Sequence, residues 1–247
     1  MDIILPPTET KSNQHVDIDK MNDDQYFNLM IDTNIEALNS ISNAKNQIKD
    51  VIKQIFKVLK NNQTGRIVYC GAGSSVRIAV QDGSELYPTF GWPQERIDFI
   101  IAGGNKALIK AIEKSEDNIK DAIAQVIHKN INEKDVVIGL AASGNTPFTY
   151  QVLKEAKQRG SLTVGIVNNK NGLIKNICDY VIVLDTGPEV VMGSTRLKAG
   201  TAQKVCLNII STGLMTKLGR VKNGMMNFLV PTNKKLIDRK NRMKKFL

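Results

Sequence analysis

The chain has 247 residues, of which 42% are hydrophobic, so it can bury a substantial core, and this excludes a disordered or fibrous protein. Its longest apolar stretches, 136–142 and 181–184, are far shorter than the roughly 20 residues that cross a bilayer, so no membrane partner is expected. The net charge of +10 owes much to 233–247, where seven Lys and Arg residues face one Asp. Such a run is typical of solvated surface, and with 5% aromatic residues no nucleic-acid partner is expected.

The amino terminus reads Met-Asp-Ile-Ile-Leu-Pro-Pro and lacks the basic and then apolar order of a signal peptide. The three cysteines, Cys70, Cys178 and Cys206, are odd in number and widely spaced, so we expect reduced thiols and a cytoplasmic location. Neither of the two histidines has a second ligand at metal-binding spacing. The sequence therefore predicts no metal and no cofactor.

Residues 1–22 are polar and show no sustained period. Apolar residues then recur every three or four positions from Ile35 to Leu59, which predicts one long helix ending near Lys60. We take 1–60 as an amino-terminal helical extension. Its amphipathic stretch, 34–60, predicts a homodimer, because such a face often requires a partner surface.

Five short apolar runs follow, each unalternated as in strands buried on both faces: 67–70, 97–102, 136–142, 162–167 and 180–184. Helix-like segments lie between and after them, around 75–86, 105–129, 147–159 and 200–218, with an ordered loop at 86–93. This alternation predicts an α/β fold, a three-layer sandwich with a five-stranded parallel sheet, over 61–220. The remaining 221–247 form a basic carboxyl-terminal segment. Ligands of such sheets bind beyond the carboxyl ends of the strands.

The first strand is followed by Gly71-Ala72-Gly73-Ser74-Ser75, whose backbone N–H groups and hydroxyls suit an anion at a helix start. A dinucleotide fingerprint requires glycine where Val76 stands, and no Walker motif is present, so nucleotide-binding proteins are disfavoured. In the alternative interpretation, the serines only cap the helix.

The third strand is followed by a similar loop, Ser143-Gly144-Asn145-Thr146, with Pro147 where a first helical turn tolerates it. Two such loops on one sheet favour a single phosphate held from two sides. A sugar phosphate is therefore the expected small-molecule ligand. The polar segment 185–204 also has the character of a binding loop, and its Arg196 and Lys198 either neutralise phosphate or are solvated.

With these loops in view, the chain resembles the N-acetylmuramic acid 6-phosphate etherase family, whose members contain a sugar isomerase (SIS) domain. The resemblance runs from about Thr8 to the carboxyl end and is most specific over 187–204. The stretches that carry it are 71–75, 82–91, 101–104, 115–117, 142–147, 187–204, 231–233 and 236–239.

The resemblance implies a lyase that eliminates D-lactate from carbon 3 of the sugar and then adds water, giving N-acetylglucosamine 6-phosphate. It implies that Glu85 is the proton donor and Glu116 the second acid/base residue. The substrate-binding residues expected on the same basis are Ser74, Ser75, Ser143, Gly144, Asn145, Thr146, Glu189, Ser194 and Lys198.

The chain departs from the family pattern at three positions. Val76 and Ile78 replace a smaller glycine and a leucine, so that Val76 is expected to crowd the phosphate, and Asn145 stands where the family often has arginine. Three alternatives stay open. They are a non-catalytic sensor similar to the glucokinase regulatory protein, an aldose–ketose isomerase, and a DNA-binding regulator, which residues 1–60 disfavour because they contain no compact helix-turn-helix unit.

Overall fold

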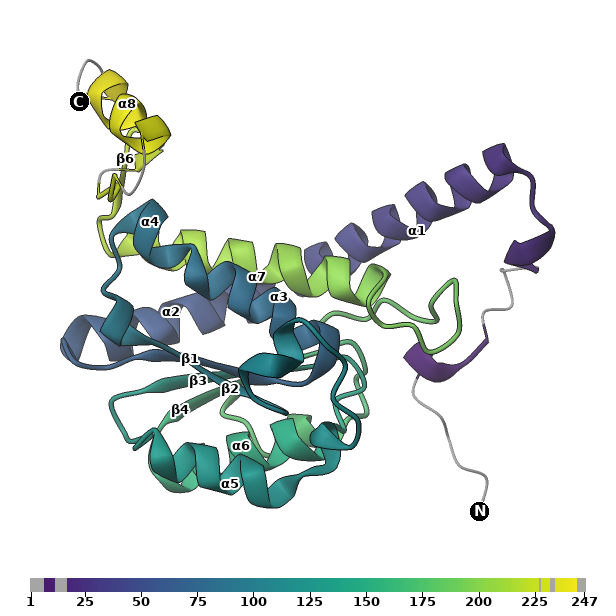
Figure 1. Ribbon diagram of the computed structural model, residues 1–247, viewed down its shortest axis with the longest axis horizontal. Helices are drawn as coiled ribbons and strands as arrows, with labels where there is room; N and C mark the ends of the chain where they lie inside the picture. The colour runs from purple at the N-terminus through teal and green to yellow at the C-terminus, as the bar shows by residue number, and fades with distance from the viewer. Residues whose placement is uncertain (1–6, 12–16, 227, 232–233, 244–247) are drawn as a thin grey trace.

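The structure, a computed structural model, describes residues 7–11, 17–226, 228–231 and 234–243 (Figure 1). Five parallel strands form one sheet in the order β2-β1-β3-β4-β5. The strands of this sheet are β1 (Ile67–Gly71), β2 (Ile97–Ile101), β3 (Val136–Ala141), β4 (Leu162–Val167) and β5 (Tyr180–Val183). Each begins at the residue predicted from the sequence and ends within one residue of the prediction.

Helices cover both faces of the sheet, which confirms the three-layer α/β prediction (Figure 1). The helices are α1 (Asp23–Asn43), α2 (Lys45–Asn61), α3 (Gly73–Ser84), α4 (Leu86–Phe90), α5 (Ile119–His128), α6 (Pro147–Gln158), α7 (Lys198–Lys217) and α8 (Lys234–Met243). Short 3-10 helices are η1 (Pro7–Glu9), η2 (Ile18–Lys20), η3 (Gln94–Arg96), η4 (Asn105–Leu108), η5 (Ser115–Asp117) and η6 (Leu173–Asn176).

The core is divided between the two faces by the alternation of strand side chains. Tyr69 and Ile138 pack toward α2, α3 and α7, whereas Cys70 and Val137 pack toward α5 and α6. All four side chains are buried. Successive strand residues point to opposite faces, so a strand covered on both sides is largely apolar, as these strands are apart from Asp98 in β2 and Thr163 in β4.

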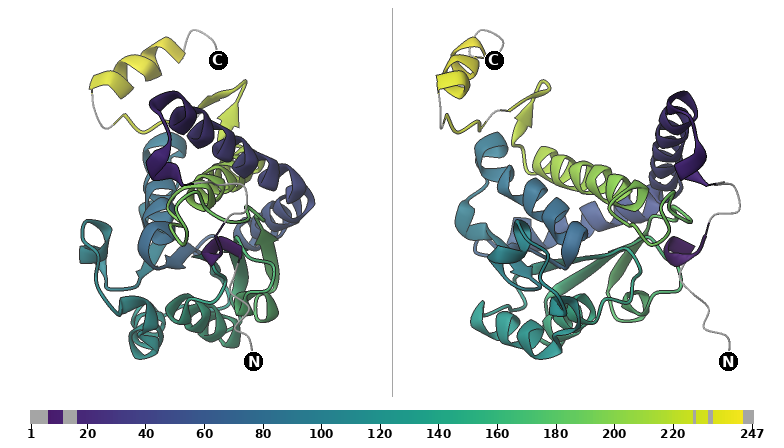
Figure 2. Two further views of the ribbon diagram at one scale, coloured as in Figure 1. Left: turned by 90° about the vertical axis from the view of Figure 1, so that its right-hand side faces the viewer. Right: turned by 45° about the vertical axis from the view of Figure 1, so that its right-hand side comes forward.

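The helical stretch ends near Lys60 as predicted, but the prediction of one continuous helix is wrong. The chain forms α1 and α2, which meet at Ala44, and α1 projects from the body as an arm (Figures 1 and 2). The last turn of α1 is rich in Ser and Asn, and the Ser40 hydroxyl donates to the Ala37 carbonyl 2.7 Å away. Such side chains compete with the helical backbone for hydrogen bonds and favour bends.

Two further segments differ from prediction. The segment 105–129 is not one helix, because η4 and η5 precede α5 and Lys114 between them has a φ of 59°, a conformation that does not continue a helix. The predicted loop 86–93 contains the short helix α4, which Gly91 ends with a φ of 60°. Trp92, just beyond it, is buried.

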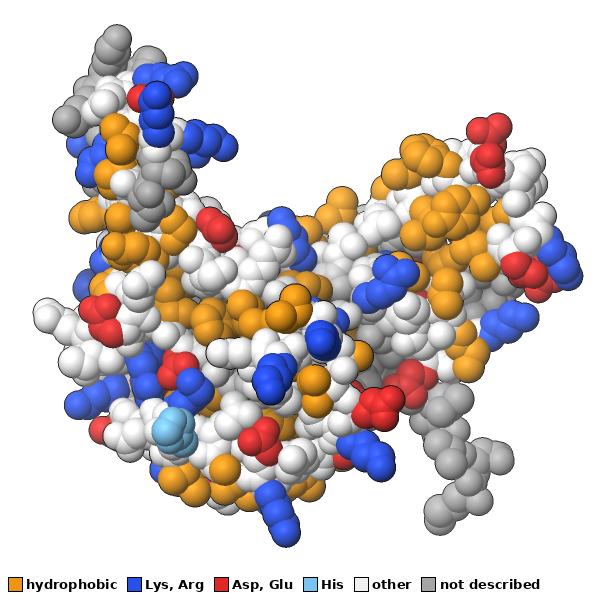
Figure 3. All heavy atoms as spheres, viewed as in Figure 1, with side chains coloured by type: hydrophobic (Ala, Val, Ile, Leu, Met, Phe, Trp, Pro, Cys, Tyr) orange, Lys and Arg blue, Asp and Glu red, His pale blue; other side chains and the backbone are white. Residues whose placement is uncertain are grey.

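The basic carboxyl-terminal segment begins with a hairpin of β6 (Val221–Lys222) and β7 (Met225–Met226). Arg220 ties it to the body by donating to the carbonyls of Phe90 and Gly91 at 2.9 and 2.7 Å. Helix α8 stands away from the sheet (Figure 1) and carries basic side chains (Figure 3). Residues 232 and 233, from one motif of the resemblance, lie outside the described residues.

In the described ranges no helix is both long and apolar enough to span a bilayer.

Candidate active site

The candidate site lies beyond the carboxyl ends of β1 and β3, neighbouring strands at which the sheet order reverses. From β1 the chain passes through Ala72 into α3, and from β3 it passes through 142–146 into α6. A reversal of this kind leaves a crevice between the first turns of the two helices. The two polar loops predicted from the sequence therefore meet at one edge of the sheet.

Neither helix start is capped by a side chain. Ala72 precedes α3 and Thr146 precedes α6, and neither position shows a side-chain capping hydrogen bond in the described residues. This contradicts the alternative in which Ser74 and Ser75 only cap the helix. The first-turn N–H groups have no partner within their own helix and are suited to bind an anion.

A cavity of about 600 Å³ opens between these loops. Its walls also include residues from η1, from η5 and from the loop before α7. Six of the predicted site residues line it: Ser74, Ser75, Glu116, Ser143, Asn145 and Thr146. The sequence therefore predicted most of the polar wall of this cavity.

Gly144 shapes the second loop without lining the cavity. Its φ is 72°, and a Cβ atom there would lie 2.9 Å from the Cα of Gly172. Both the backbone conformation and the close approach require glycine. Beside it, Asn145 donates its backbone N–H to the Ser143 hydroxyl at 3.1 Å, and the Asn145 side-chain oxygen accepts from Leu173 N at 2.9 Å. The loop is thus fixed on η6.

Val76 does not crowd the cavity as expected. Its side chain is fully buried and packs with Ile101 and Ala107 on the flank of α3. The larger residue in place of glycine therefore fills a small apolar cluster and does not line the cavity.

The charges around the cavity are unusual for an anion site. Three acidic residues, Glu9, Glu116 and Asp117, line it, and no Lys or Arg does among the described residues. A phosphate placed between Ser74 and Thr146 would be held by N–H groups and hydroxyls, with the positive ends of α3 and α6 directed at it.

Glu189 and Lys198, expected in the pocket, do not line this cavity. Glu189 is 1% exposed and accepts hydrogen bonds from the backbone N–H groups of Lys198 and Ala199 at 3.1 and 2.9 Å, so it caps α7. Burial raises the pKa of Glu189, although these hydrogen bonds oppose the shift. The Lys198 ammonium pairs with Glu36 of α1 at 2.7 Å.

These two residues instead hold the loop that precedes α7. Gly193 and Thr195 of this loop line the cavity, whereas Ser194, the predicted residue between them, does not. Arg196 is exposed and likewise lies outside the lining. The predicted loop therefore borders the cavity, but through Gly193 and Thr195 rather than through Ser194.

Glu85 lies far from the cavity in a single chain. It is exposed, directly after α3, whereas Gly73 and Ser74 at the other end of that helix line the cavity. Twelve helical residues separate the two ends by about 18 Å. One copy of the chain therefore brings Glu116 into the cavity but not Glu85.

Glu9 is a wall residue that sequence reasoning missed. It belongs to η1, beside the buried Thr8, and follows two prolines in a segment with no apolar period. Periodicity could not place it, because its position depends on contacts with loops more than sixty residues away.

The described residues contain neither a candidate metal site nor a disulfide bond. No group of three His, Cys, Asp or Glu side chains there is arranged to hold a metal ion. Cys70, Cys178 and Cys206 are unpaired, and two of them are buried.

The sequence matches two family models, the glucokinase regulatory protein N-terminal SIS domain over 50–157 and the SIS domain over 114–210. Among solved structures, it is similar to an Escherichia coli CFT073 protein solved as a complex, with a TM-score of 0.59 and 17% identity over 83% of this chain and 97% of that one. A phosphoheptose isomerase from Francisella tularensis gives a TM-score of 0.56 and 21% identity, covering 78% of this chain and 96% of the other. These similarities establish the fold.

Curated relatives are more similar in sequence. An N-acetylmuramic acid 6-phosphate etherase from Clostridium acetobutylicum is 44% identical over 94% of this chain and 76% of its own length. One from Mycoplasma mycoides is 43% identical with the same coverage of both chains. At this level of identity over nearly all of its length, the chain belongs to the N-acetylmuramic acid 6-phosphate etherase family.

Proposed function

We propose that this chain is a carbon–oxygen lyase that cleaves the D-lactyl ether of N-acetylmuramic acid 6-phosphate, as part of amino sugar and cell-wall recycling. The observation that carries the proposal is the 44% identity to a named etherase over 94% of the chain. The polar cavity at the sheet edge supports it, because the family motifs around Ser74, Glu116 and Ser143 converge there. The sensor alternative is not favoured, since the curated relatives at this identity are named as enzymes.

The reaction balances as an elimination followed by an addition. A base removes the proton from carbon 2, a carbon 2–carbon 3 double bond forms, and the bond from carbon 3 to the lactyl oxygen breaks as that oxygen gains a proton. Water then adds at carbon 3 and carbon 2 regains a proton, giving N-acetylglucosamine 6-phosphate and D-lactate. The enzyme therefore has to bind the phosphate and transfer protons at two neighbouring carbons.

We assign phosphate binding to Ser74, Ser75, Ser143 and Thr146, which line the cavity at the starts of α3 and α6. Glu116 is the acid/base residue in our proposal, because its carboxylate belongs to η5 in the wall of the same cavity. The Glu116→Gln variant keeps the shape and loses the transferable proton, so we expect D-lactate release to fall by about 10²- to 10⁴-fold.

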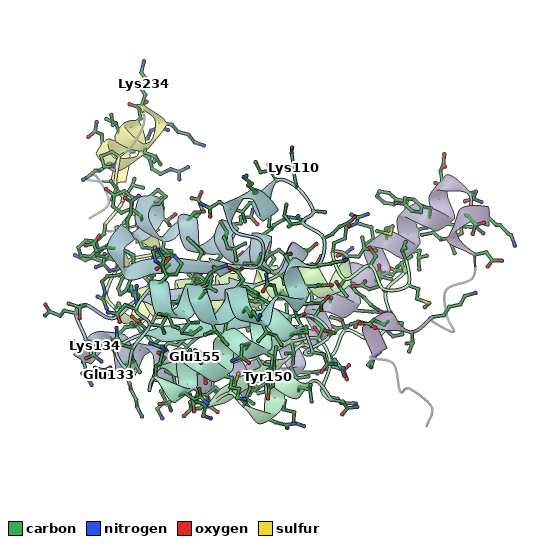
Figure 4. All side chains as sticks on the ribbon, turned by 60° about the horizontal axis from the view of Figure 1, so that its bottom comes forward. Lys110, Glu133, Lys134, Tyr150, Glu155 and Lys234 are labelled. Carbon is green, nitrogen blue, oxygen red and sulfur yellow. The ribbon has the colours of Figure 1, made fainter. Side chains whose placement is uncertain are left out.

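The matched control is Glu133→Gln. Glu133 is an exposed glutamate that does not line this cavity (Figure 4). Its variant is expected to release D-lactate at the wild-type rate. Full activity in Glu116→Gln would remove Glu116 from the mechanism. No release by the wild-type chain, despite binding of the sugar phosphate, would overturn the lyase proposal.

We also propose a homodimer. Helix α1 presents a row of exposed apolar side chains along its arm, with Phe27 65% exposed (Figure 3). The other members of this row are Tyr26, Ile31, Ile35 and Leu38. An apolar groove of about 430 Å³ continues the row at the base of the arm, between Ile41, Ile52 and Ile209. Contiguous apolar surface of this kind is typical of protein interfaces.

We infer a cytoplasmic location from the unpaired cysteines.

The role of Glu85 as proton donor depends on this dimer. Because Glu85 lies at the far end of α3, it reaches a sugar only in the cavity of a second copy. Co-expressing Glu85→Gln with Glu116→Gln chains tests this arrangement. If each site takes Glu116 from one copy and Glu85 from the other, hybrid dimers keep one intact site, and the mixture recovers about one quarter of wild-type activity. No recovery would exclude the shared site and leave Glu9 or Asp117 as the second acid.

A further inference from the structure

A smaller pocket of about 270 Å³ adjoins the main cavity. It lies between the first turns of α3 and the segment that runs from Ala102 to Glu116. Ala72, Gly73, Ser74 and Glu116 line both spaces. The start of α3 and the carboxylate of Glu116 therefore stand at the junction of two compartments.

The two compartments differ in charge. The main cavity has no basic residue in its lining among the described residues, whereas the smaller pocket has Arg77 and Lys114. Glu113 and Glu116 also line the smaller pocket, so its formal charges balance while those of the main cavity are all negative. Of the two spaces, only the smaller one has, among the described residues of its lining, basic side chains that could pair with an anionic group of the ligand.

Arg77 is held in place by the backbone. Its Nε and Nη2 donate to the Ala107 carbonyl at 3.0 and 2.9 Å, and Nη2 also reaches the Lys110 carbonyl at 3.3 Å. The Lys110 side chain itself points outward from this segment (Figure 4). No ion pair of the described residues involves Arg77, so this half-buried guanidinium has no carboxylate partner of its own. A fixed, planar cation of this kind is suited to bind a carboxylate.

The proposed substrate carries two separate anionic groups, a phosphate and the carboxylate of the lactyl ether. We propose that the phosphate occupies the main cavity and that the smaller pocket binds the lactyl group, with Arg77 holding its carboxylate. This inference rests on the proposed function and adds the residue that distinguishes the substrate from sugar phosphates without a lactyl group. The side chains of Ala107, Ala111 and Ile112 give the pocket an apolar wall for the lactyl methyl group.

The arrangement places Glu116 beside the bond that breaks. With the sugar on one side of the junction and the lactyl group on the other, the carbon 3–oxygen bond crosses the junction that Glu116 lines. When this bond breaks and its oxygen gains a proton, D-lactate is left in the smaller pocket with its carboxylate still on Arg77. D-lactate should therefore act as a product inhibitor through this pocket.

The test compares two ligands in the same variant. In Arg77→Gln, we expect KM for N-acetylmuramic acid 6-phosphate to rise by about 10- to 100-fold, the effect of losing a charge-assisted hydrogen bond. Inhibition by D-lactate should weaken in parallel. The Kd of N-acetylglucosamine 6-phosphate, which has no carboxylate, should stay within about twofold by calorimetry, and this also shows that the variant is folded. Lys120→Met, which removes an exposed charge outside both pockets, is the control.

A second pair of variants tests the pocket without changing Arg77 or its hydrogen bonds. Ala111 is exposed and lines the smaller pocket, so Ala111→Glu adds a negative charge there, and Ala111→Gln adds the same bulk without charge. We expect only the glutamate to raise KM for the lactyl sugar.

Equal losses for both ligands in Arg77→Gln, or no difference between the two Ala111 variants, would overturn the inference. If the wild-type chain releases no D-lactate, the proposed function fails on its own. The lactyl sugar would then stay intact during a calorimetric titration. Its Kd for each variant could therefore be measured directly and compared in place of KM.

Discussion

Replacing Glu189 with glutamine tests whether the cap of α7 holds the pocket loop in place. The carboxylate is buried and accepts from the backbone N–H groups of Lys198 and Ala199. It therefore fixes the start of a 20-residue helix and the end of the loop whose Gly193 and Thr195 line the cavity. A glutamine has nearly the same shape but carries one acceptor oxygen in place of two and no charge.

The expected cost follows from these contacts. One of the two N–H groups would face an amide NH₂, and a buried donor without a partner costs about 1–3 kcal/mol. Losing a negative charge at a helix start costs about 0.3–1 kcal/mol more. Burial raises the pKa of Glu189, so the charged form is itself costly there, and removing it offsets part of the loss. We expect the free energy of unfolding to fall by about 1–3 kcal/mol in total.

Guanidinium unfolding measures this loss, and calorimetric titration with N-acetylglucosamine 6-phosphate measures the effect on the pocket. The matched control is Glu155→Gln, because Glu155 of α6 (Figure 4) forms a pair at 3.1 Å with Arg159, the residue directly after that helix. Pairs of this spacing contribute about 0.3–0.5 kcal/mol. If Glu189→Gln were as stable as this control and bound the sugar phosphate with unchanged Kd, the cap would not hold the loop, and the reasoning would be refuted.

Three other substitutions test separate parts of the structure. Ser74→Ala should weaken sugar-phosphate binding by about 1 kcal/mol, roughly fivefold in Kd by calorimetry, because one hydroxyl contact is lost. Burial raises the pKa of Asp82 above its ordinary value of 3.8. The stability that the protonated carboxyl group contributes is therefore fully present below pH 3.8 and is lost as the pH rises through the pKa of the folded state. Asp82→Asn cannot ionise, and its stability relative to the wild type should therefore increase as the pH rises above 3.8 in guanidinium unfolding. Gly144→Ala, which forces a Cβ toward Gly172 at positive φ, should cost at least about 1–2 kcal/mol by the same measurement and should also weaken binding.

The sheet was predictable because its signal is local. Runs such as 136–142 are apolar at every position, and a strand covered on both faces requires this whatever lies next to it. The bend at Ala44 and the break around Lys114 had no comparable signal. Both depend on polar side chains and on single dihedral angles, which periodicity does not report.

The site was predictable to the extent that it lies on strand-end loops. Ser74 and Ser143 follow adjacent strands, and parallel strands bring their carboxyl ends together. Glu189, expected in the pocket, caps α7 and does not line the cavity. The sequence of a polar loop does not distinguish residues that face a ligand from residues that cap the helix after it. Arg77 escaped notice because it lies on a helix whose apolar face dominated the pattern.

The position of α1 connects the predicted dimer surface with the pocket. Glu36 on this helix pairs with Lys198, which is only 3% exposed, and Lys198 donates its backbone N–H to Glu189. The same helix presents the exposed apolar row that we assign to the second copy. We therefore expect contacts that immobilise the α1 arm to immobilise the start of α7 as well, together with the loop whose Thr195 lines the cavity. In a dimer held by this arm, assembly of the interface and ordering of the pocket wall are expected to occur together, because both depend on the same helix.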